Sequence, residues 1–218
     1  MPQKQSLWTF SCTLYAADGV ADCCLFLQDE YDVDVTLLLF SLWYAGQLGE
    51  FRPSDLTAAC QISQQWRAEV VAPLRRIRRR MKATHGADSS RPANETDSAE
   101  AMPLFPPEQK EFSNAREQLR QQVKHCELEA EKLQLQLLEA KAMNTKAQVG
   151  VQMRVQMRAQ AGPTACETEE DLATIMTRNL QALQQAMHYN QLMESQYAHL
   201  VAAALKLWQT GDEQSASH

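Results

Sequence analysis

Residues 24–46 read CLFLQDEYDVDVTLLLFSLWYAG and contain the most apolar run of the chain. Within this stretch, residues 35–45 carry apolar side chains around the whole circumference of a helix. A helix that is hydrophobic on all sides is normally buried. Gly46, with a second glycine at position 49, is expected to stop it. The stretch therefore predicts a short central helix around which neighbouring helices pack.

Four acidic residues, Asp29, Glu30, Asp32 and Asp34, come directly before this helix. Carboxylates at a helix start accept hydrogen bonds from free backbone amides, and their charge suits the helix dipole. Carboxylates are also ligands for divalent cations, but a metal centre needs a second facing acidic group, and residues 1–85 offer only this one. We therefore favour capping by Asp32 or Asp34. Asp29, Asp32 and Asp34 remain weak metal candidates, with a metal-dependent helical enzyme as the second alternative function.

The composition indicates an all-α protein. Among 218 residues there are only 7 glycines and 8 prolines, while 44% are hydrophobic. Leu, Ala, Gln, Glu and Met are abundant, and these residues lose little freedom in a helix. The net charge of −6 argues weakly against a whole-chain nucleic-acid binder.

Several features point to a soluble cytoplasmic protein without a membrane partner. The first residues, MPQKQSLWTF, lack the apolar core of a signal peptide. The longest apolar run is shorter than the ~20 residues that a membrane helix needs. The six cysteines lack zinc-ligand spacing, so we interpret them as reduced structural thiols.

No local motif predicts an enzyme. The chain contains no GxSxG, P-loop, GxGxxG or HExxH sequence. We therefore expect no catalytic residue and no cofactor.

Periodic apolar positions predict a small helical domain over residues 1–83. Its helices are expected at 6–17, from about 20, at 35–45, and from a cap at Ser54 onward. Pro73 should kink the last of these near Val70, because proline lacks a backbone N–H and clashes with the preceding turn. The predicted core contains large apolar residues from three of these helices: Trp8, Leu38, Leu42, Trp43 and Trp66.

The last helix of this domain ends in the basic segment PLRRIRRRMK, residues 73–82. One interpretation is a solvated face that pairs with acidic residues of the C-terminal half, and this is the one we favour. The alternative is an RNA- or ribosome-associated factor that binds phosphate, although no aromatic residues are interleaved for base stacking. Anionic lipid is a further ligand that this charge would suit. The candidate residues are Arg75, Arg76, Arg78, Arg79, Arg80 and Lys82.

The C-terminal half predicts a long antiparallel helical hairpin of coiled-coil character. A polar linker over 84–107, expected to be disordered, precedes a helix over 108–161. After Gly162 and Pro163, a second helix is expected over 164–210, followed by a disordered tail over 211–218. Apolar residues follow heptad spacing on both helices. In the first helix the seam comprises Leu119, Val123, Cys126, Ala130, Leu133, Leu137, Ala140, Asn144, Ala147 and Val151.

Polar residues interrupt both seams at Asn144, Asn179 and Asn190. An asparagine in a seam can fix register or oligomeric state, or it can mark a looser, partly solvated contact. The hairpin could pair within one chain or join two copies in a homodimer.

Four blocks of the N-terminal half resemble a family of short proteobacterial proteins classed as a domain of unknown function. They are LW.F...LY (residues 7–15), CLFLQ (24–28), DVTLLLFSLW (34–43) and W.AEVVAPLR..R (66–78). Residues 119–138, LRQQVKHCELEAEKLQLQLL, resemble the helix that ends that domain. The resemblance covers about residues 6–83 and 112–140 and leaves 141–218 as an extension. It implies a compact helical protein of the bacterial cytoplasm and no assigned activity.

Together these features favour a protein–protein interaction or scaffolding module. The partner surface is expected on the hairpin or on the basic helix end. The partner itself is expected to be a protein of unknown identity, and nucleic acid is the less favoured ligand.

Overall fold

The computed structural model describes residues 5–82, 110–157, 171–189 and 194–215, and every regular element within them is a helix. The predicted all-α class is therefore confirmed. The helices are α1 (Leu7–Tyr15), α2 (Val20–Tyr31), α3 (Val35–Leu48), α4 (Pro53–Trp66), the π-helical turn η1 (Arg67–Val71), α5 (Ala72–Arg80), α6 (Lys110–Met157), α7 (Leu172–Met187) and α8 (Glu194–Ser215). The predicted linker over 84–107 lies outside the described residues.

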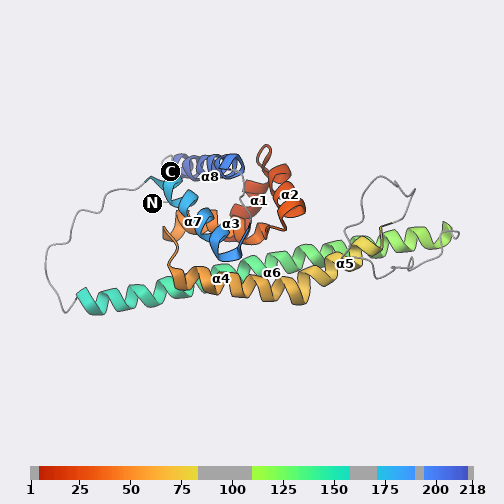
Figure 1. The fold of residues 1–218 in the computed structure, drawn as a ribbon, viewed down its shortest axis with the longest axis horizontal. Coiled ribbons are helices and arrows are strands. Elements are labelled where there is room, and N and C mark those ends of the chain that lie inside the picture. The colour runs from red at the N-terminus through yellow and green to blue at the C-terminus, as the bar shows by residue number, and fades with distance from the viewer. Residues whose placement is uncertain (1–4, 83–109, 158–170, 190–193, 216–218) are drawn as a thin grey trace. The chain divides into compact units, whose positions relative to one another are not determined.

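The chain divides into two compact units that differ from the predicted domains. The first unit comprises Met1–Gln64 and Leu133–His218, and the second comprises Gln65–Lys132. The C-terminal residues therefore share a unit with the N-terminal helices instead of forming a separate hairpin. Figure 1 shows α7 and α8, in blue, beside the red and orange helices α1–α3 of the same unit.

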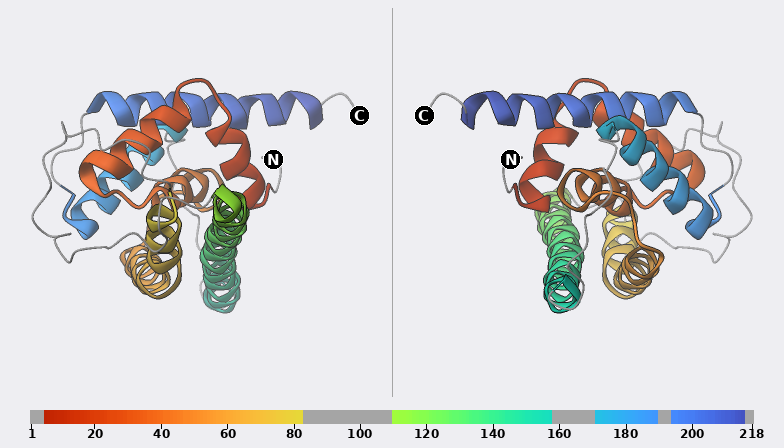
Figure 2. Two further views of the ribbon diagram at one scale, coloured as in Figure 1. Left: turned by 90° about the vertical axis from the view of Figure 1, so that its right-hand side faces the viewer. Right: turned by 90° about the vertical axis from the view of Figure 1, so that its left-hand side faces the viewer.

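The core of the first unit is built around α3, as its apolar sequence predicts. Residues 37–45 are all buried, and α1, α7 and α8 pack against this helix. Figure 2 shows α8 lying across α1 and α2, which it also contacts. Leu135, Leu138 and Ala142 of α6 belong to the same core. The central position of α3 follows from its composition, because it has no polar face to turn toward water.

Short polar residues and left-handed turns set the starts and ends of the first helices. The hydroxyl of Ser6 accepts a hydrogen bond from the amide of Thr9 and caps α1. Asp32 adopts a left-handed conformation, with φ 52°, and ends α2. Asp34 caps α3 by accepting hydrogen bonds from the amides of Thr36 and Leu37. Of the two residues proposed as caps, Asp34 is therefore the one that performs this role.

Gly46 does not stop α3, contrary to the prediction from sequence. The helix continues to Leu48, and Gly49, with φ 87°, lies at its C-terminal cap. A Cβ atom at position 46 would lie 2.3 Å from Cε2 of Trp208 on α8. Glycine is therefore needed here so that an indole ring can pack directly on the backbone of α3.

The predicted kink near Val70 corresponds to η1. The amide of Ala72 donates to the carbonyl of Arg67, five residues earlier, which is the spacing of a π-helix. This wider turn comes immediately before Pro73, whose ring crowds the preceding turn and which has no N–H to donate. The helix start is also shifted, since α4 begins at Pro53 and not after Ser54.

The helix predicted over 164–210 is two helices. α7 ends at Met187, where His188 adopts a left-handed conformation with φ 54°, and α8 begins at Glu194. Much of its apolar seam is buried, but against different partners from those expected, because α7 packs on α3 and α8. The buried seam residues are Met176, Leu183, Tyr197, Leu200 and Ala204. α8 also extends to Ser215, so the tail expected from 211 is helical up to that residue.

Asn179, a polar seam residue of α7, is buried because its side chain forms hydrogen bonds with backbone groups. Its side-chain oxygen accepts a hydrogen bond from the amide of Phe51 at 2.8 Å. Its Nδ2 donates to the carbonyl of Gly49 at 3.1 Å. Asn179 therefore satisfies backbone groups in the turn after α3. Asn190 lies outside the described residues, and Asn144 is exposed on α6.

No single described helix is long and apolar enough to cross a membrane. The bent pair α1 and α2 meets the length and composition of a broken span, and both helices contribute buried apolar residues to the core of the first unit.

Candidate interaction surfaces

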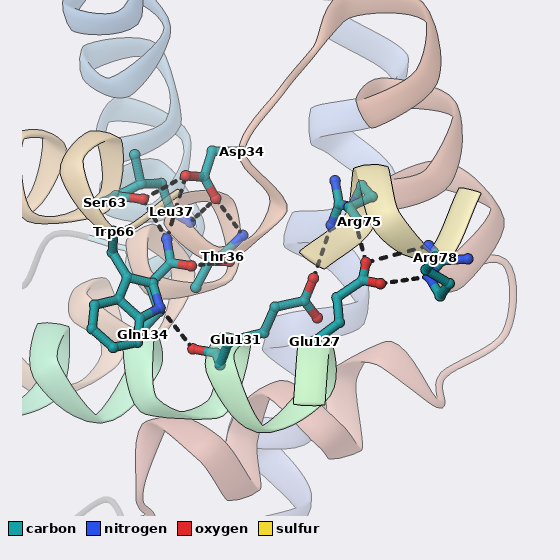
Figure 3. A network of polar contacts seen from close by, with 11 residues as sticks. Asp34, Thr36, Leu37, Ser63, Trp66, Arg75, Arg78, Glu127, Glu131 and Gln134 are labelled. Atoms are coloured by element: carbon teal, nitrogen blue, oxygen red, sulfur yellow. Dashed lines mark hydrogen bonds and ion pairs between the residues drawn. The ribbon is translucent and has the colours of Figure 1, made fainter. Parts of the chain in front are cut away.

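The basic segment of α5 is divided into two faces. In the second unit, Arg75 contacts two carboxylates of α6: Nε donates to Glu127 at 3.0 Å and Nη2 donates to Glu131 at 2.8 Å. Arg78 binds Glu127 through Nε and, at 3.3 Å, through Nη2 (Figure 3). The favoured interpretation of the basic run, pairing with acidic residues of the C-terminal half, therefore describes these two arginines.

These ion pairs are largely removed from water, which strengthens them. The side chains of Arg75 and Arg78 are 18% and 27% exposed, and that of Glu127 is 9% exposed. Burial alone would raise the pKa of Glu127, but hydrogen bonds from Arg78 and Arg75 outweigh it and lower the pKa. Burial would likewise lower the pKa of Arg75, and the hydrogen bond to Glu127 and the charges of both glutamates raise it instead.

Replacing Glu127 with glutamine should therefore lower the free energy of unfolding by about 2 kcal/mol at pH 7. The change keeps the side-chain shape but leaves two half-buried guanidinium groups without their shared charge. The folded-state pKa of Glu127 lies below its ordinary value of 4.5. Its contribution is thus fully present above pH 4.5 and is lost as the pH falls through the lower, folded-state pKa. Urea denaturation across this pH range measures both effects.

Glu129→Gln is the matched control on the same helix. Glu129 pairs with Lys132 at 3.5 Å, and their side chains are 47% and 33% exposed, more than those of the Glu127 pairs. Such surface pairs contribute little, so a change below about 0.5 kcal/mol is expected. Equal losses for the two variants would show that the Glu127 cluster has no special role.

Three of the remaining basic residues lie within α5 and form the outer basic face, which we define as Arg76, Arg79 and Arg80. All three are exposed, and so is Lys82 just beyond the helix. Residues at i, i+3 and i+4 lie on the same side of a helix. Arg76 therefore shares one side of α5 with Arg79 and Arg80, and this side adjoins the one from which Arg75 and Arg78 reach α6.

A buried polar cluster in the first unit surrounds Asp34. Its Oδ1 accepts from the amide of Thr36 at 3.0 Å and its Oδ2 accepts from the hydroxyl of Ser63 (Figure 3). Gln134 of α6 donates to Ser63 and lies 3.5 Å from Asp34 Oδ2. The hydroxyl of Tyr189 accepts from the amide of Asp34 at 3.0 Å. The carboxylate of Asp34 thus joins α3, α4 and α6, and its backbone amide adds Tyr189 as a fourth segment.

α6 also has an exposed apolar face. In the first unit, Leu133 and Leu137 are 48% and 45% exposed. Ala140 follows on the same side and is exposed as well. We name these three residues the α6 stripe. Leu119 and Cys126, on the part of α6 in the second unit, are exposed too and continue the heptad spacing.

The seam predicted for α6 is therefore largely not the face that packs in the fold. The buried side of the helix instead carries Glu127, Ala130, Gln134, Leu138 and Ala142. Only Ala130 belongs to both faces, with Val123 half-buried beside it. Heptad spacing identifies the most apolar side of α6. The packed side is instead marked by Glu127 and Gln134, which form hydrogen bonds with residues of other helices.

Comparison with known families is informative for the N-terminal half only. Residues 6–104 match the family Protein of unknown function (DUF2390). The expected resemblance to a family of unknown function is thus confirmed for somewhat under half of the chain. The DUF2390 match includes residues 84–104 and ends before residues 112–140, which we had also expected to be covered. No curated protein and no solved structure matches the chain.

The DUF2390 match contains α1–α5 and stops before α6. In the first unit, the carboxylate of Asp34 and the hydroxyl of Ser63 lie in the match, and Gln134 lies outside it. In the second unit, Arg75 lies inside and its partner Glu127 outside. Buried polar groups of the DUF2390 region thus find their hydrogen-bond partners on α6.

The acidic residues before α3 do not converge. Asp29 and Asp32 are exposed, whereas Asp34 is buried with its oxygens engaged by amides and a hydroxyl. Within the described residues, no group of three His, Cys, Asp or Glu side chains is placed to hold a metal ion.

The described cysteines are free thiols, and burial makes several of them less acidic. They are Cys12, Cys23, Cys24, Cys60 and Cys126, while Cys166 lies outside the described residues. Burial, followed by the charge of Cys23, raises the pKa of Cys24 to about 12. Burial and then Asp34 raise the pKa of Cys60. Such thiols form little thiolate near neutral pH and are poor nucleophiles.

The predicted core residues divide in the same way as the units. Leu38, Leu42 and Trp43 are fully buried on α3, and Trp8 is partly buried against them. Trp66 belongs to the second unit and is only half-buried. Its Nε1 donates to the carbonyl of Ala130 at 2.9 Å (Figure 3). Trp66 is thus not part of the α3 core, because its ring lies beside α6 in the other unit.

Proposed function

We propose that this protein is a helical interaction module that binds a second copy of itself through the α6 stripe. The observation that supports this is the exposure of Leu133 and Leu137, two leucines four residues apart on one side of α6. Exposed apolar residues scattered singly are common, whereas a row at heptad spacing is the seam that a second helix needs.

A second copy suits this stripe because its pattern is complementary to itself. A two-fold dimer requires that the same surface be used by both molecules. In an antiparallel pair, Leu133 of one copy can pack against Leu137 of the other, and the reverse contact follows from the symmetry. The exposed Asn144 further along the seam would then serve the register role considered for it.

The test is the molar mass in solution, measured by light scattering after size-exclusion chromatography over a hundredfold range of concentration. We expect the wild-type chain to shift from monomer to dimer, and Leu133→Lys/Leu137→Lys to remain monomeric. Lysine favours helices as leucine does, so the fold should be retained. The matched control is Leu25→Lys/Leu128→Lys, which places the same charges on two exposed leucines elsewhere.

Dimerisation of the control variant but not of the stripe variant would support the proposal. A wild-type chain that stays monomeric at every concentration would contradict it. Dimerisation that survives in the stripe variant would equally contradict it, because the contact would then lie elsewhere.

A further inference from the structure

Among the residues that the structure describes, the ion pairs of α5 are made by Arg75 and Arg78 and not by the outer basic face. Arg75 and Arg78 are bound to Glu127 and Glu131, whose carboxylates are thereby engaged. Arg76, Arg79 and Arg80 lie on the same nine-residue helix and are exposed. Together with Lys82, these arginines give the segment four exposed positive charges in a chain whose net charge is −6.

We propose that the outer basic face binds the phosphodiester backbone of a nucleic acid. Arginine presents a planar fork of donors that matches phosphate oxygens in bidentate geometry, which lysine cannot do. Three arginines at i, i+3 and i+4 place three such forks side by side, about 5–6 Å apart at their Cβ atoms. The row fits a ligand with regularly repeated phosphates better than a single phosphate group.

The ion pairs on the inner side prepare this face for binding. Arg75 and Arg78 anchor α5 to α6 through four hydrogen bonds, so the orientation of the helix is fixed before any ligand arrives. A preformed surface loses less conformational freedom on binding. The same pairs also neutralise the nearest carboxylates, which would otherwise repel phosphate.

An anionic membrane is the less suitable ligand. A helix that lies on a membrane surface buries a continuous apolar face in the lipid boundary. Of the large apolar residues on α5 and at its C-terminal cap, Ile77 is 43% exposed, while Leu74 and Met81 are half-buried. α5 also carries no aromatic residue. The face consequently offers charge without an apolar anchor.

The experiment is fluorescence anisotropy with three labelled probes: single-stranded RNA, single-stranded DNA of the same sequence, and the DNA duplex. We expect binding at low salt that weakens as salt rises. If three phosphates are neutralised, log Kd against log salt should have a slope of magnitude about 2 for the single strands and about 3 for the duplex. The three probes show which nucleic acid is preferred. Salt-dependent binding of any one of them supports the proposal.

Arg76→Gln/Arg79→Gln/Arg80→Gln should bind at least tenfold more weakly than the wild type. Glutamine is a good helix former, so circular dichroism should show an unchanged fold, and Arg79→Gln alone provides a milder variant with a smaller loss. The control with the same charge change is Lys141→Gln/Lys146→Gln/Lys206→Gln, which replaces exposed lysines of the first unit. It should bind within twofold of the wild type.

Three outcomes would overturn the inference. The first is that none of the probes binds at low salt. The second is equal weakening by the arginine and lysine variants, which would reveal a general charge effect. The third is binding to vesicles of anionic lipid but to none of the nucleic acids, which would assign the face to a membrane.

Discussion

Replacing Trp43 with alanine is expected to lower the free energy of unfolding by ~3–5 kcal/mol, which is the usual cost of removing a buried tryptophan side chain. Trp43 is 0% exposed in the middle of α3. Its ring stacks on Phe40 with centroids 6.1 Å apart, and its Nε1 donates to the carbonyl of Gln5 at 2.9 Å. The substitution would leave a large cavity at the centre of the first unit. Urea denaturation followed by far-UV circular dichroism measures the loss.

Trp8→Ala is the matched control for Trp43→Ala. Trp8 packs against the same core but keeps part of its surface in water, so a smaller loss of about 1–2 kcal/mol is expected. A loss below about 1 kcal/mol for Trp43→Ala, or a larger loss for Trp8→Ala, would show that α3 is not the centre of this core.

The parts of the fold that could be predicted are those determined by residues within or next to a single helix. Residues 37–45 are apolar on every side and are buried on every side. Ser6 and Asp34 cap α1 and α3 because short polar side chains can reach the first free amides of a helix. Pro73 marks the π-helical turn just before it. Each of these inferences depends on residues that are near one another in sequence.

The parts that could not be predicted depend on pairing between distant residues. Glu127 faces the interior of its unit because it accepts hydrogen bonds from Arg75 and Arg78, and Gln134 because it donates one to Ser63. These partners lie about 50 to 70 residues away in sequence. The spacing of apolar residues shows which side of α6 is apolar. It does not show which polar residues of α6 will form hydrogen bonds with residues far away in sequence. The exposed leucines were consequently assigned to a packed seam.

A similar limit explains the missing hairpin. From 172 to 207 the seam positions keep helical spacing without a break, although Asn179 and Asn190 are polar. The break at His188 is a backbone conformation that a non-glycine residue adopts only occasionally. The seam of α7 and α8 is satisfied by α3, whose all-round apolar surface needs neighbours on several sides. Packing against the buried helix α3 thus had more influence on this segment than its own continuous helical spacing.

Asp34→Ala is expected to cost about 3 kcal/mol, although it removes only one short side chain. Loss of the cap leaves the amides of Thr36 and Leu37 without their acceptor, which costs about 1 kcal/mol. The hydroxyl of Ser63 also loses its acceptor in a buried site, and an unsatisfied buried donor costs about 1–3 kcal/mol. Chemical denaturation at neutral pH gives the difference from wild type.

Two further variants separate these causes. Asp34→Asn keeps an oxygen that can cap α3 but removes the charge, so we expect a loss between those of the wild type and Asp34→Ala. Asp29→Ala changes an exposed acid five residues earlier in the same acidic stretch of sequence, and it should alter stability by less than about 0.5 kcal/mol. If Asp34→Ala were as mild as Asp29→Ala, the carboxylate would not be the junction of α3, α4 and α6 that the hydrogen bonds to Thr36, Ser63 and Gln134 indicate. The order of the three losses therefore tests whether one buried acid, supplied by the loop before α3, organises the first unit.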